Sequence, residues 1–529
     1  MTQITKKTPK NIVFIVLDTH RQDRLGVYGY DKPTSPNIDK FADNATVFEM
    51  AISPGQWTIP AHASMFSGEY PTTHMTVQSA DALDSRFRTL AERLGEHGYH
   101  TTGFCNNPLV GVLNNGLKRG FQTFYQYGGA VPTVPERKVS AWRKPFHKLW
   151  TQYTRILRKI SYPIQNLVAQ RDGAFHFALN PLLVPLWSRY ANFKGDTEQS
   201  IQDTNEYLRA YKFENTETSE KPLFLFVNLM ETHLPYTPPD KYIKQFAPIV
   251  KRDRAAQDFI RKYNTLALRW LLPMEKPFSE LEYETLSGMY DAEVAYQDAQ
   301  IAQLLDTLDT PYHRKNTMVI IVGDHGEMLG EHQIMGHGLG AYQPLVHVPL
   351  LIRFPGQTEG KRVRAPVTTT HLFHTSLHAA GVDVLETEYS NEIDIASMSF
   401  AQWYHNPEKP SGHIYTEAYP PQNVISIMEK LEPGLLEAYH SRETVRGVYR
   451  KTHKYIQTEN IGDDIFDLEA DPDENYPLED PALRERFQRN LGEYLERATS
   501  RRPENFQRGG VNLDDDTLRQ RMRGLGYIE

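Results

Sequence analysis

Three apolar segments of this 529-residue chain end in side chains that can bind a metal ion or transfer a proton. Each segment is followed within three residues by a carboxylate or an imidazole: Asp18 after 11–17, His233 after 222–230, and Asp324 with His325 after 317–322. In open α/β sheets, ligands bind outside the carboxyl ends of the strands. If the three segments are neighbouring strands, these groups converge, and two carboxylates with an imidazole predict a divalent metal site.

A fourth segment adds a hydroxyl group. In 55–71 (GQWTIPAHASMFSGEYP), Pro60 suits the first turn of a short helix and Gly68 suits its end, which places Thr58 at or just before the helix start. Thr58 is either an N-cap only or a nucleophile aimed at an anionic ester. A helix N-terminus favours phosphate or sulfate, because its free N–H groups carry positive partial charge.

The apolar segments predict the fold class. Each is too short for a buried helix and lacks polar alternation, which is typical of strands buried on both faces of a mostly parallel sheet. The segment 282–308 has helical apolar spacing and lies between two of them. We therefore expect an α/β protein with a mostly parallel central sheet between helices.

The pattern changes near residue 412, where short strands follow one another at 413–419, 444–450 and 453–458, before a final helix at 481–499. The predicted organisation is a catalytic α/β domain over 1–411 and a smaller C-terminal α+β subdomain over 412–529. Helical insertions are expected at about 135–215 and 253–277.

The composition of the chain excludes several classes of protein and of site. Lys and Arg total 58 and Asp and Glu total 66, a net charge of −8, so we expect no nucleic-acid partner. The one cysteine, Cys105, rules out an intrachain disulfide or a thiolate zinc cluster and is predicted to be a small buried residue. No apolar run approaches the roughly 18–20 residues of a membrane-spanning helix, and no signal-peptide pattern precedes the first strand. These features predict a cytoplasmic protein.

In this order, the segments resemble the sulfatase branch of the alkaline phosphatase superfamily. The resemblance covers roughly residues 10–130 and 220–480. The matching segments are 16–30 (VLDTHRQDRLGVYGY), 53–74 (SPGQWTIPAHASMFSGEYPTTH), 226–239 (FVNLMETHLPYTPP), the helical 290–308, 320–356 (beginning IIVGDHGEMLGEH) and 451–475 (beginning KTHKYIQTEN). The resemblance implies an alkaline phosphatase-like fold and hydrolysis of an anionic ester.

The resemblance also implies roles for individual residues. The implied metal ligands are Asp18, Thr58, Asp324 and His325, around one divalent ion (Mn, Ca or Zn). The implied catalytic residues are Thr58 as nucleophile, His233 at the ester oxygens or leaving group, His337 where many relatives have lysine, and His62 where the family motif has arginine. The candidate substrate-binding residues are Asn106, Asn107 and His332. The alternatives for these are a packing role for His62, turn formation for the asparagines and loop orientation for His332. Thr19 replaces a common second aspartate ligand, and Arg21 with Asp23 is expected to form a structural ion pair.

Threonine at position 58 favours phosphoryl chemistry. Sulfatases normally convert Cys or Ser at this position into formylglycine, an aldehyde that threonine cannot form by the same oxidation. A phosphorylated threonine can be released by attack of water on phosphorus. We therefore expect a hydrolase of phosphodiesters, phosphomonoesters or phosphonate esters. Sulfuric ester hydrolysis is the alternative, with a transferase or a non-catalytic binding relative ranked below it.

The sequence allows several roles for one basic region. Residues 135–172 carry nine Lys and Arg against two acidic residues, with an apolar stripe at helical spacing. Three interpretations fit: a helix packed on the core, a lid that recruits an acidic substrate, or contact with anionic lipid through 142–160. Trp150 and 180–187 are candidates for contacts in a homo-oligomer or a lid. The expected substrate is a small-molecule, glycan-linked or lipid-linked anionic ester.

Overall fold

The computed structural model describes residues 10–128, 132–135, 194–211, 221–265, 272–382, 384–387 and 390–510. The expectations for 142–160 and 180–187, and most of those for 135–172, lie outside these residues.

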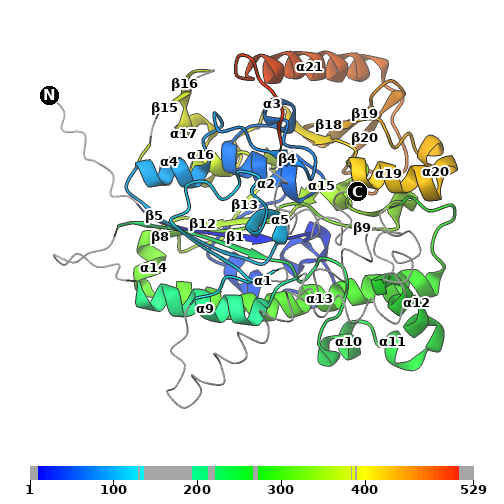
Figure 1. Cartoon of the computed structure of the whole chain (residues 1–529), viewed down its shortest axis with the longest axis horizontal. Helices are drawn as coiled ribbons and strands as arrows, with labels where there is room; N and C mark the ends of the chain where they lie inside the picture. The colour runs from blue at the N-terminus through cyan, green and yellow to red at the C-terminus, as the bar shows by residue number, and fades with distance from the viewer. Residues whose placement is uncertain are drawn as a thin grey trace, which may run out of the picture.

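A central eight-stranded sheet organises the larger part of the chain (Figure 1). Its strands run in the order β13 (Lys361–Val363), β2 (Thr46–Phe48), β12 (Leu350–Arg353), β8 (Thr317–Gly323), β1 (Asn11–Leu17), β7 (Leu223–Leu229), β5 (His100–Cys105) and β6 (Thr123–Gln126). The five strands from β8 to β6 are parallel to one another, and β12 is antiparallel to both β8 and β2. The predicted mostly parallel sheet is confirmed.

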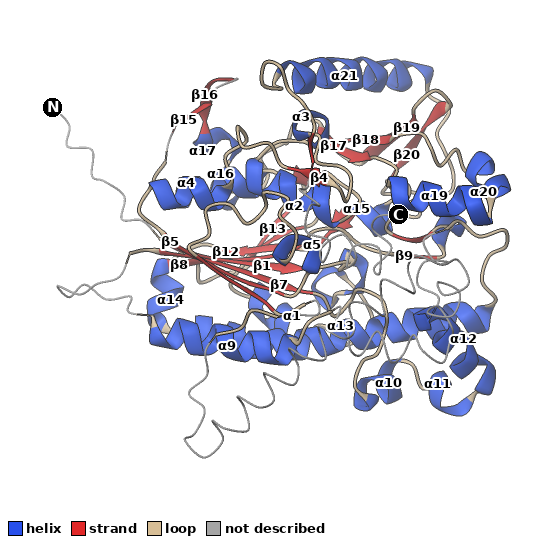
Figure 2. Ribbon diagram, viewed as in Figure 1, coloured by secondary structure: helices blue, strands red, loops and turns tan. Residues whose placement is uncertain are grey.

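Both faces of the sheet are covered, which explains the apolar strands. In β1, Ile12, Phe14 and Val16 join one core cluster, while the alternate residues Val13, Ile15 and Leu17 join the other. This is the period-two separation that pleated strands impose. Helices α2 (Thr58–Ser67), α4 (Leu90–Glu96) and α16 (His371–Ala379) cover the first face, and α1 (Pro36–Ala42), α9 (Thr197–Ala210) and α13 (Glu280–Leu308) cover the second (Figure 2).

Local signals fix the two helices that matter most for the site. Helix α13 begins after Ser279, whose side chain accepts from the N–H of Glu282 while the Glu282 side chain accepts from the N–H of Ser279, a capping box. Helix α2 ends at Gly68 in the left-handed conformation, at a φ of 75°. The predicted start at residue 282 is two residues late, whereas Thr58 is the first residue of α2, which agrees with its predicted place at or just before the helix start.

Shorter elements connect the layers. The helices among them are α3 (Pro71–His74), α5 (Pro108–Gly111), α10 (Asp240–Phe246), α11 (Ile249–Arg252), α12 (Arg254–Thr265), α14 (Pro311–Asn316), α15 (Gln343–Val346), α17 (Ile395–Met398) and α18 (Ala401–His405). The short strands are β3 (Ala51–Ile52), β4 (Asp81–Ala82), β9 (Met328–Leu329), β10 (Met335–Gly336), β11 (His347–Val348), β14 (Val367–Thr368), β15 (Val384–Thr387), β16 (Ser390–Asp394) and β21 (Gly509–Gly510). The helical insertion expected over 253–277 is too long, since 272–277 is irregular and holds two prolines, which lack the N–H that a helix interior needs.

The C-terminal part contains a four-stranded antiparallel sheet: β17 (Ile414–Ala418), β18 (Val445–Arg450), β19 (His453–Thr458) and β20 (Gly462–Asp467). Helix α21 (Pro481–Ser500) packs on it through Phe487, Leu491 and Tyr494, which confirms the predicted final helix. Helices α19 (Gln422–Leu431) and α20 (Pro433–Ala438), which connect β17 to β18, were not predicted.

The small sheet is anchored to the loops of the larger part. The backbone N–H of Glu417 donates to Pro54 O (3.0 Å), and Gln56 Nε2 donates to Tyr419 O (2.7 Å). The fully buried Lys454 pairs with the fully buried Glu474. Lys454 Nζ also donates to Ala341 O (2.6 Å), and Glu474 Oε2 accepts from the N–H of Gln343 (2.6 Å). One buried ion pair therefore fixes the loop that follows β10.

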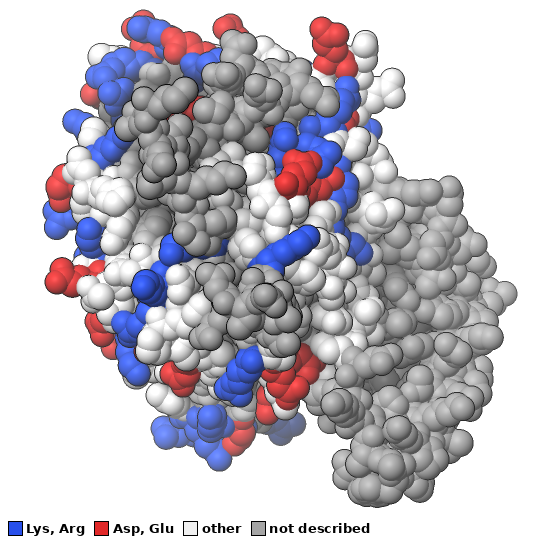
Figure 3. Space-filling view, turned by 90° about the vertical axis from the view of Figure 1, so that its left-hand side faces the viewer, with Lys and Arg blue, Asp and Glu red and all other residues white. Residues whose placement is uncertain are grey.

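The surface mixes charges of both signs. Lys and Arg are interspersed with Asp and Glu on the face in Figure 3. Within the described ranges, every helix is too short or too polar to cross a lipid bilayer.

Removing one charge of the buried pair should destabilise the fold. We expect Glu474→Gln to lower the free energy of unfolding by about 3 kcal/mol, because Lys454 is left buried without a counter-charge. Urea denaturation measures the loss. The double variant Lys454→Met/Glu474→Gln should recover most of it, and a double variant as unstable as Glu474→Gln alone would contradict the pairing.

Candidate metal centre and active site

Four adjacent parallel strands bring the candidate residues to one edge of the sheet. Strand β8 leads into Asp324, β1 into Asp18, β7 into the loop that holds His233, and β5 into Asn106 and Asn107. Because β8, β1, β7 and β5 are consecutive and parallel, their carboxyl ends lie side by side.

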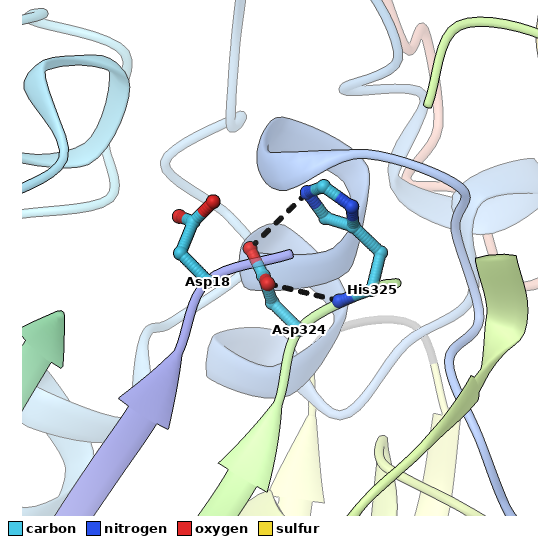
Figure 4. A group of neighbouring side chains, drawn as sticks. All are labelled: Asp18, Asp324 and His325. Atoms are coloured by element: carbon cyan, nitrogen blue, oxygen red, sulfur yellow. Dashed lines mark hydrogen bonds and ion pairs between the residues drawn. The ribbon is translucent and has the colours of Figure 1, made fainter. Parts of the chain in front are cut away.

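Asp18, Asp324 and His325 form a compact group with ligand atoms within 4.8 Å of one another (Figure 4). All three side chains are fully buried. Asp18 Oδ2 accepts from Asn107 Nδ2 (2.5 Å), and Asp324 Oδ1 accepts from the N–H groups of His325 (2.9 Å) and Thr19 (3.2 Å). The second oxygen of each aspartate has no hydrogen-bond partner among the described residues.

The tautomer of His325 completes the donor set. Its Nδ1 lies 2.9 Å from Gly326 O, and a carbonyl can only accept, so Nδ1 carries the proton. Nε2 therefore presents its lone pair 3.5 Å from Asp324 Oδ2. Two free carboxylate oxygens and an imidazole lone pair around one point fit a divalent cation.

Electrostatics support this assignment. Burial raises the pKa of Asp18 to about 6, although the hydrogen bond from Asn107 opposes the shift. Burial and the charge of Asp18 raise the pKa of Asp324 well above its usual range. Burial holds the pKa of His325 well below its usual range, so this imidazole is neutral, the form that binds metals. The two carboxylates need a nearby positive charge to stay ionised together.

Thr58 lies beside this group. It is the first residue of α2, after the N-cap Trp57, and it is buried. Its Oγ1 is 3.4 Å from His325 Nε2 and 3.4 Å from Asn107 Nδ2. The Thr58 side chain is not the N-cap, and its hydroxyl faces the candidate metal ligands.

The two predicted asparagines, Asn106 and Asn107, contact different parts of the structure. Asn107 caps α5, with its Oδ1 accepting from Leu109 N–H (2.8 Å), while its Nδ2 reaches Asp18 and Thr58. Asn107 therefore combines the two predicted alternatives, turn formation and a place in the site. Asn106 turns toward α9, where its Nδ2 donates to Thr197 Oγ1 (2.7 Å).

His62 lies behind the metal group. Its Nδ1 is 3.0 Å from Thr58 O, one turn earlier in α2, and 3.4 Å from Asp324 Oδ2. Its ring packs edge-on to Phe66 and Phe226, and burial lowers its pKa to about 4. This placement supports orientation of Asp324 by a neutral imidazole, and contact of His62 with the transferring group stays a prediction.

The imidazoles of His233, His325 and His337 lie close together. The ring of His337 is 4.7 Å from that of His325 and 5.1 Å from that of His233, measured between ring centres. His337 Nδ1 is 2.9 Å from Glu327 Oε1. Burial opposes a charge on His337, but the Glu327 carboxylate outweighs it and raises the pKa of His337. Burial and the charge of His337 hold the pKa of His233 well below its usual range.

The side chains of His332 and Thr19 make contacts within the protein. The His332 ring stacks on Tyr342 with ring centres 3.9 Å apart, which agrees with the loop-orienting alternative. Thr19 Oγ1 donates to Asp18 O (2.7 Å), so its hydroxyl is occupied and its backbone N–H serves Asp324. The Arg21–Asp23 ion pair is confirmed at 2.7 Å, and Cys105 is fully buried as predicted.

Sequence patterns missed three supporting residues. Glu327 lies three residues after Asp324 and carries the partner of His337. Tyr290 of α13 donates to Thr19 O (2.6 Å) and accepts from Arg21 N–H (2.9 Å), which holds Thr19 at a φ of 55°. Lys194 donates to Glu231 O (2.6 Å) beside His233. The spacing of Asp324 and Glu327 was visible in the sequence, whereas the contacts of Tyr290 with Thr19 and Arg21, which span 271 and 269 residues, were not.

The fold and this site define a class of architecture: an alkaline phosphatase-like α/β fold with a candidate site for a divalent ion. The family model described as Sulfatase matches residues 10–382. The chain belongs to the sulfatase family, whose enzymes use a divalent metal ion.

Individual relatives are distant. The chain is 24% identical over 388 residues to a protein of Escherichia coli K12 named uncharacterized sulfatase YidJ, covering 70% of this chain and 68% of that protein. It is 26% identical to iduronate 2-sulfatase of Mus musculus, covering 66% of this chain and 60% of the relative. The phosphonate monoester hydrolase of Silicibacter pomeroyi has a similar fold, with a TM-score of 0.62, 18% identity and coverage of 92% of this chain and 96% of that one.

Metal binding should depend on Asp324 and on pH. We expect Asp324→Asn to weaken Mn²⁺ binding at least about tenfold. The affinity of the unaltered protein should fall as the pH drops through about 6, because protonation of the raised-pKa Asp18 removes the charge that the cation needs. Calorimetric titration on either side of that pH measures both effects.

The control is Asp240→Asn, at the exposed start of α10. It should bind Mn²⁺ like the unaltered protein. Equal metal content in the Asp324→Asn variant and the control would contradict the ligand assignment.

Proposed function

We propose that this protein is a metal-dependent hydrolase of phosphoric or phosphonic esters that uses Thr58 as its nucleophile. The observation that carries the proposal is the position of Thr58 Oγ1, 3.4 Å from His325 Nε2 at the edge of the Asp18 and Asp324 group. The free N–H groups of the first turn of α2 favour an anionic group there.

The side chain at position 58 selects the chemistry. A methyl group on Cβ prevents oxidation of Thr58 to an aldehyde, so sulfate could not leave by cleavage of a Cβ–O bond in a hydrated aldehyde. A phosphoryl or phosphonyl group on Thr58 can leave by attack of water on phosphorus.

The donor set fits one Mn²⁺, Ca²⁺ or Zn²⁺ ion held by Asp18, Asp324, His325 and Thr58. When bound, such an ion supplies positive charge that favours the deprotonated Thr58 hydroxyl and offsets charge on the transferring group. Asn107 orients this arrangement, since its Nδ2 bridges Asp18 and Thr58.

The protein groups then account for two displacement steps. Thr58 Oγ, its proton lost to solvent, forms a bond to phosphorus as the bond to the alcohol oxygen breaks. His337, kept protonated by Glu327, gives its proton to that oxygen. Water next attacks phosphorus, the bond to Thr58 breaks, and the now neutral His337 takes a proton from the water. His233, neutral and with its Nδ1–H donating to Leu234 O (2.7 Å), presents the lone pair of Nε2, which can accept a hydrogen bond from the attacking water or the departing alcohol.

Sulfuric ester hydrolysis is the second candidate, because the sequence relatives are named sulfatases. The structural neighbour from Silicibacter pomeroyi is named a phosphonate monoester hydrolase, which supports the first candidate. Both classes of substrate are anionic esters, and Thr58 decides our ranking of them.

Removal of the Thr58 hydroxyl should abolish turnover. We expect Thr58→Ala to lower kcat by roughly a thousandfold or more, with Mn²⁺ affinity largely retained. The assay compares nitrophenyl esters of phosphate, a phosphodiester, a phosphonate and sulfate. Ser67→Ala, which removes a hydroxyl from the far end of α2, is the control. Turnover by Thr58→Ala at the control's rate would refute the nucleophile, and preference for the sulfate would reverse the ranking.

Loss of the Glu327 charge should shift the alkaline limb of the pH–rate profile. A raised pKa keeps His337 protonated, so acid catalysis is lost as the pH rises through that pKa. Glu327→Gln should lower the pKa and move the alkaline limb down by about one pH unit. The effect should be larger for an alkyl ester, whose leaving oxygen needs the proton, than for a nitrophenyl ester. An unshifted profile would rule His337 out as the acid.

A further inference from the structure

The loop that carries His233 is held by an ion pair from two other parts of the chain. Lys194 lies just before α9 and Glu293 lies in α13, and these two helices contact each other (Figure 1). Lys194 Nζ donates to Glu231 O (2.6 Å) and to Glu293 Oε1 (2.8 Å). The same Glu293 oxygen accepts from the N–H of Thr237 (2.6 Å). The pair therefore binds the loop on both sides of His233.

The ion pair is almost completely removed from water. The side chain of Lys194 is 13% exposed and that of Glu293 is 1% exposed. Burial raises the pKa of Glu293 to about 7, although the charge of Lys194 opposes the shift. A buried ion pair adds little net stability, because desolvation of the two charges offsets their attraction. The hydrogen bonds to the loop backbone are therefore the main effect of the pair on the structure.

The orientation of the His233 ring depends on the path of this loop. The Nδ1–H of His233 donates to Leu234 O (2.7 Å), and this carbonyl lies between the two points at which the ion pair binds the loop. A shift of the loop backbone would move the carbonyl and, with it, the direction of the Nε2 lone pair. Burial, the charge of His337 and the charge of Lys194 together hold the pKa of His233 well below its usual range, which keeps Nε2 unprotonated.

Lys194 reaches the loop because the chain approaches the sheet edge closely at the next residue. Gly195 has a φ of 71°, and a Cβ at this position would lie 3.0 Å from Gly128 N. At the end of β5, Asn106 Nδ2 donates to the hydroxyl of Thr197, the first residue of α9 (2.7 Å). The contact of Asn106 with α9 thus supports the position of Lys194.

We propose that Lys194 and Glu293 are positioning residues, which fix the loop so that His233 Nε2 can accept a hydrogen bond from the attacking water or the departing alcohol. The inference rests on the proposed ester hydrolysis, since it assigns the pair an effect on turnover only through His233. A pair with a merely structural role would affect turnover whether or not the His233 imidazole is present.

A double-mutant cycle separates these two roles. In the otherwise unaltered protein, we expect Lys194→Met to lower kcat at least about fivefold and to change KM less than about twofold, because a small misplacement of a catalytic group is costly. In the His233→Ala background, the same substitution should change kcat less than about twofold. The control is Lys244→Met, at an exposed lysine of α10, which should keep the kcat of the unaltered protein.

The assay uses whichever nitrophenyl ester the unaltered protein cleaves. An equal loss from Lys194→Met in both backgrounds would overturn the proposal, and so would an unchanged kcat for Lys194→Met or for His233→Ala alone. An active Thr58→Ala variant together with the expected cycle would refute the nucleophile and leave the coupling between Lys194 and His233 standing.

Glu293 is tested by a conservative exchange, which also serves if Lys194→Met folds poorly. Glu293→Gln keeps an oxygen that can accept from Lys194 and Thr237, so it should retain at least about half of kcat. Glu293→Leu should lose as much as Lys194→Met. Mn²⁺ affinity should be unchanged in both variants, because the described contacts of Glu293 do not include a metal ligand. Full kcat in Glu293→Leu, or equal losses in the two variants, would overturn the role of Glu293.

Discussion

The site depends on the burial of two carboxylates that require a cation. Asp18 and Asp324 are both removed from water, and each leaves one oxygen without a hydrogen-bond partner among the described residues. Two such charges within a few ångströms are unfavourable unless a positive ion lies between them. The neutral His325 imidazole and the Thr58 hydroxyl face the same point. The chemistry proposed for Thr58 depends on the same requirement, because charge that offsets two carboxylates also favours an alkoxide beside them.

The surrounding fold holds the two aspartates, His325 and Thr58 together. Parallel strands β8, β1, β7 and β5 deliver their ends to one edge, and the α2 N-terminus brings Thr58 to it. The C-terminal sheet then fixes the flanking loops: Glu417 and Tyr419 hold the segment before Thr58, and the buried Lys454–Glu474 pair holds the loop after His337.

Much of this arrangement could be predicted from local patterns. Apolar runs without alternation identified β1, β7 and β8, and the polar residues that end them identified Asp18, Asp324 and His325. Spacing could not distinguish the two roles of Asn107, because its contact with Asp18 spans 89 residues. It could not find Glu327 as the partner of His337 either, since that contact depends on the turn between β9 and β10. Helices α19 and α20 were missed because the sequence between the expected strands carries no strong capping signal. The position of His62 in the family motif did not predict its neighbour, because the structure turns the His62 ring toward Asp324.

Anomalous diffraction from crystals grown with Mn²⁺ tests the central claim most directly. The account predicts a single strong peak about 2.0–2.4 Å from Asp18, Asp324 and His325, with Thr58 Oγ1 within the same sphere. A peak elsewhere, or a Thr58 hydroxyl turned away from an ion bound at these ligands, would contradict it.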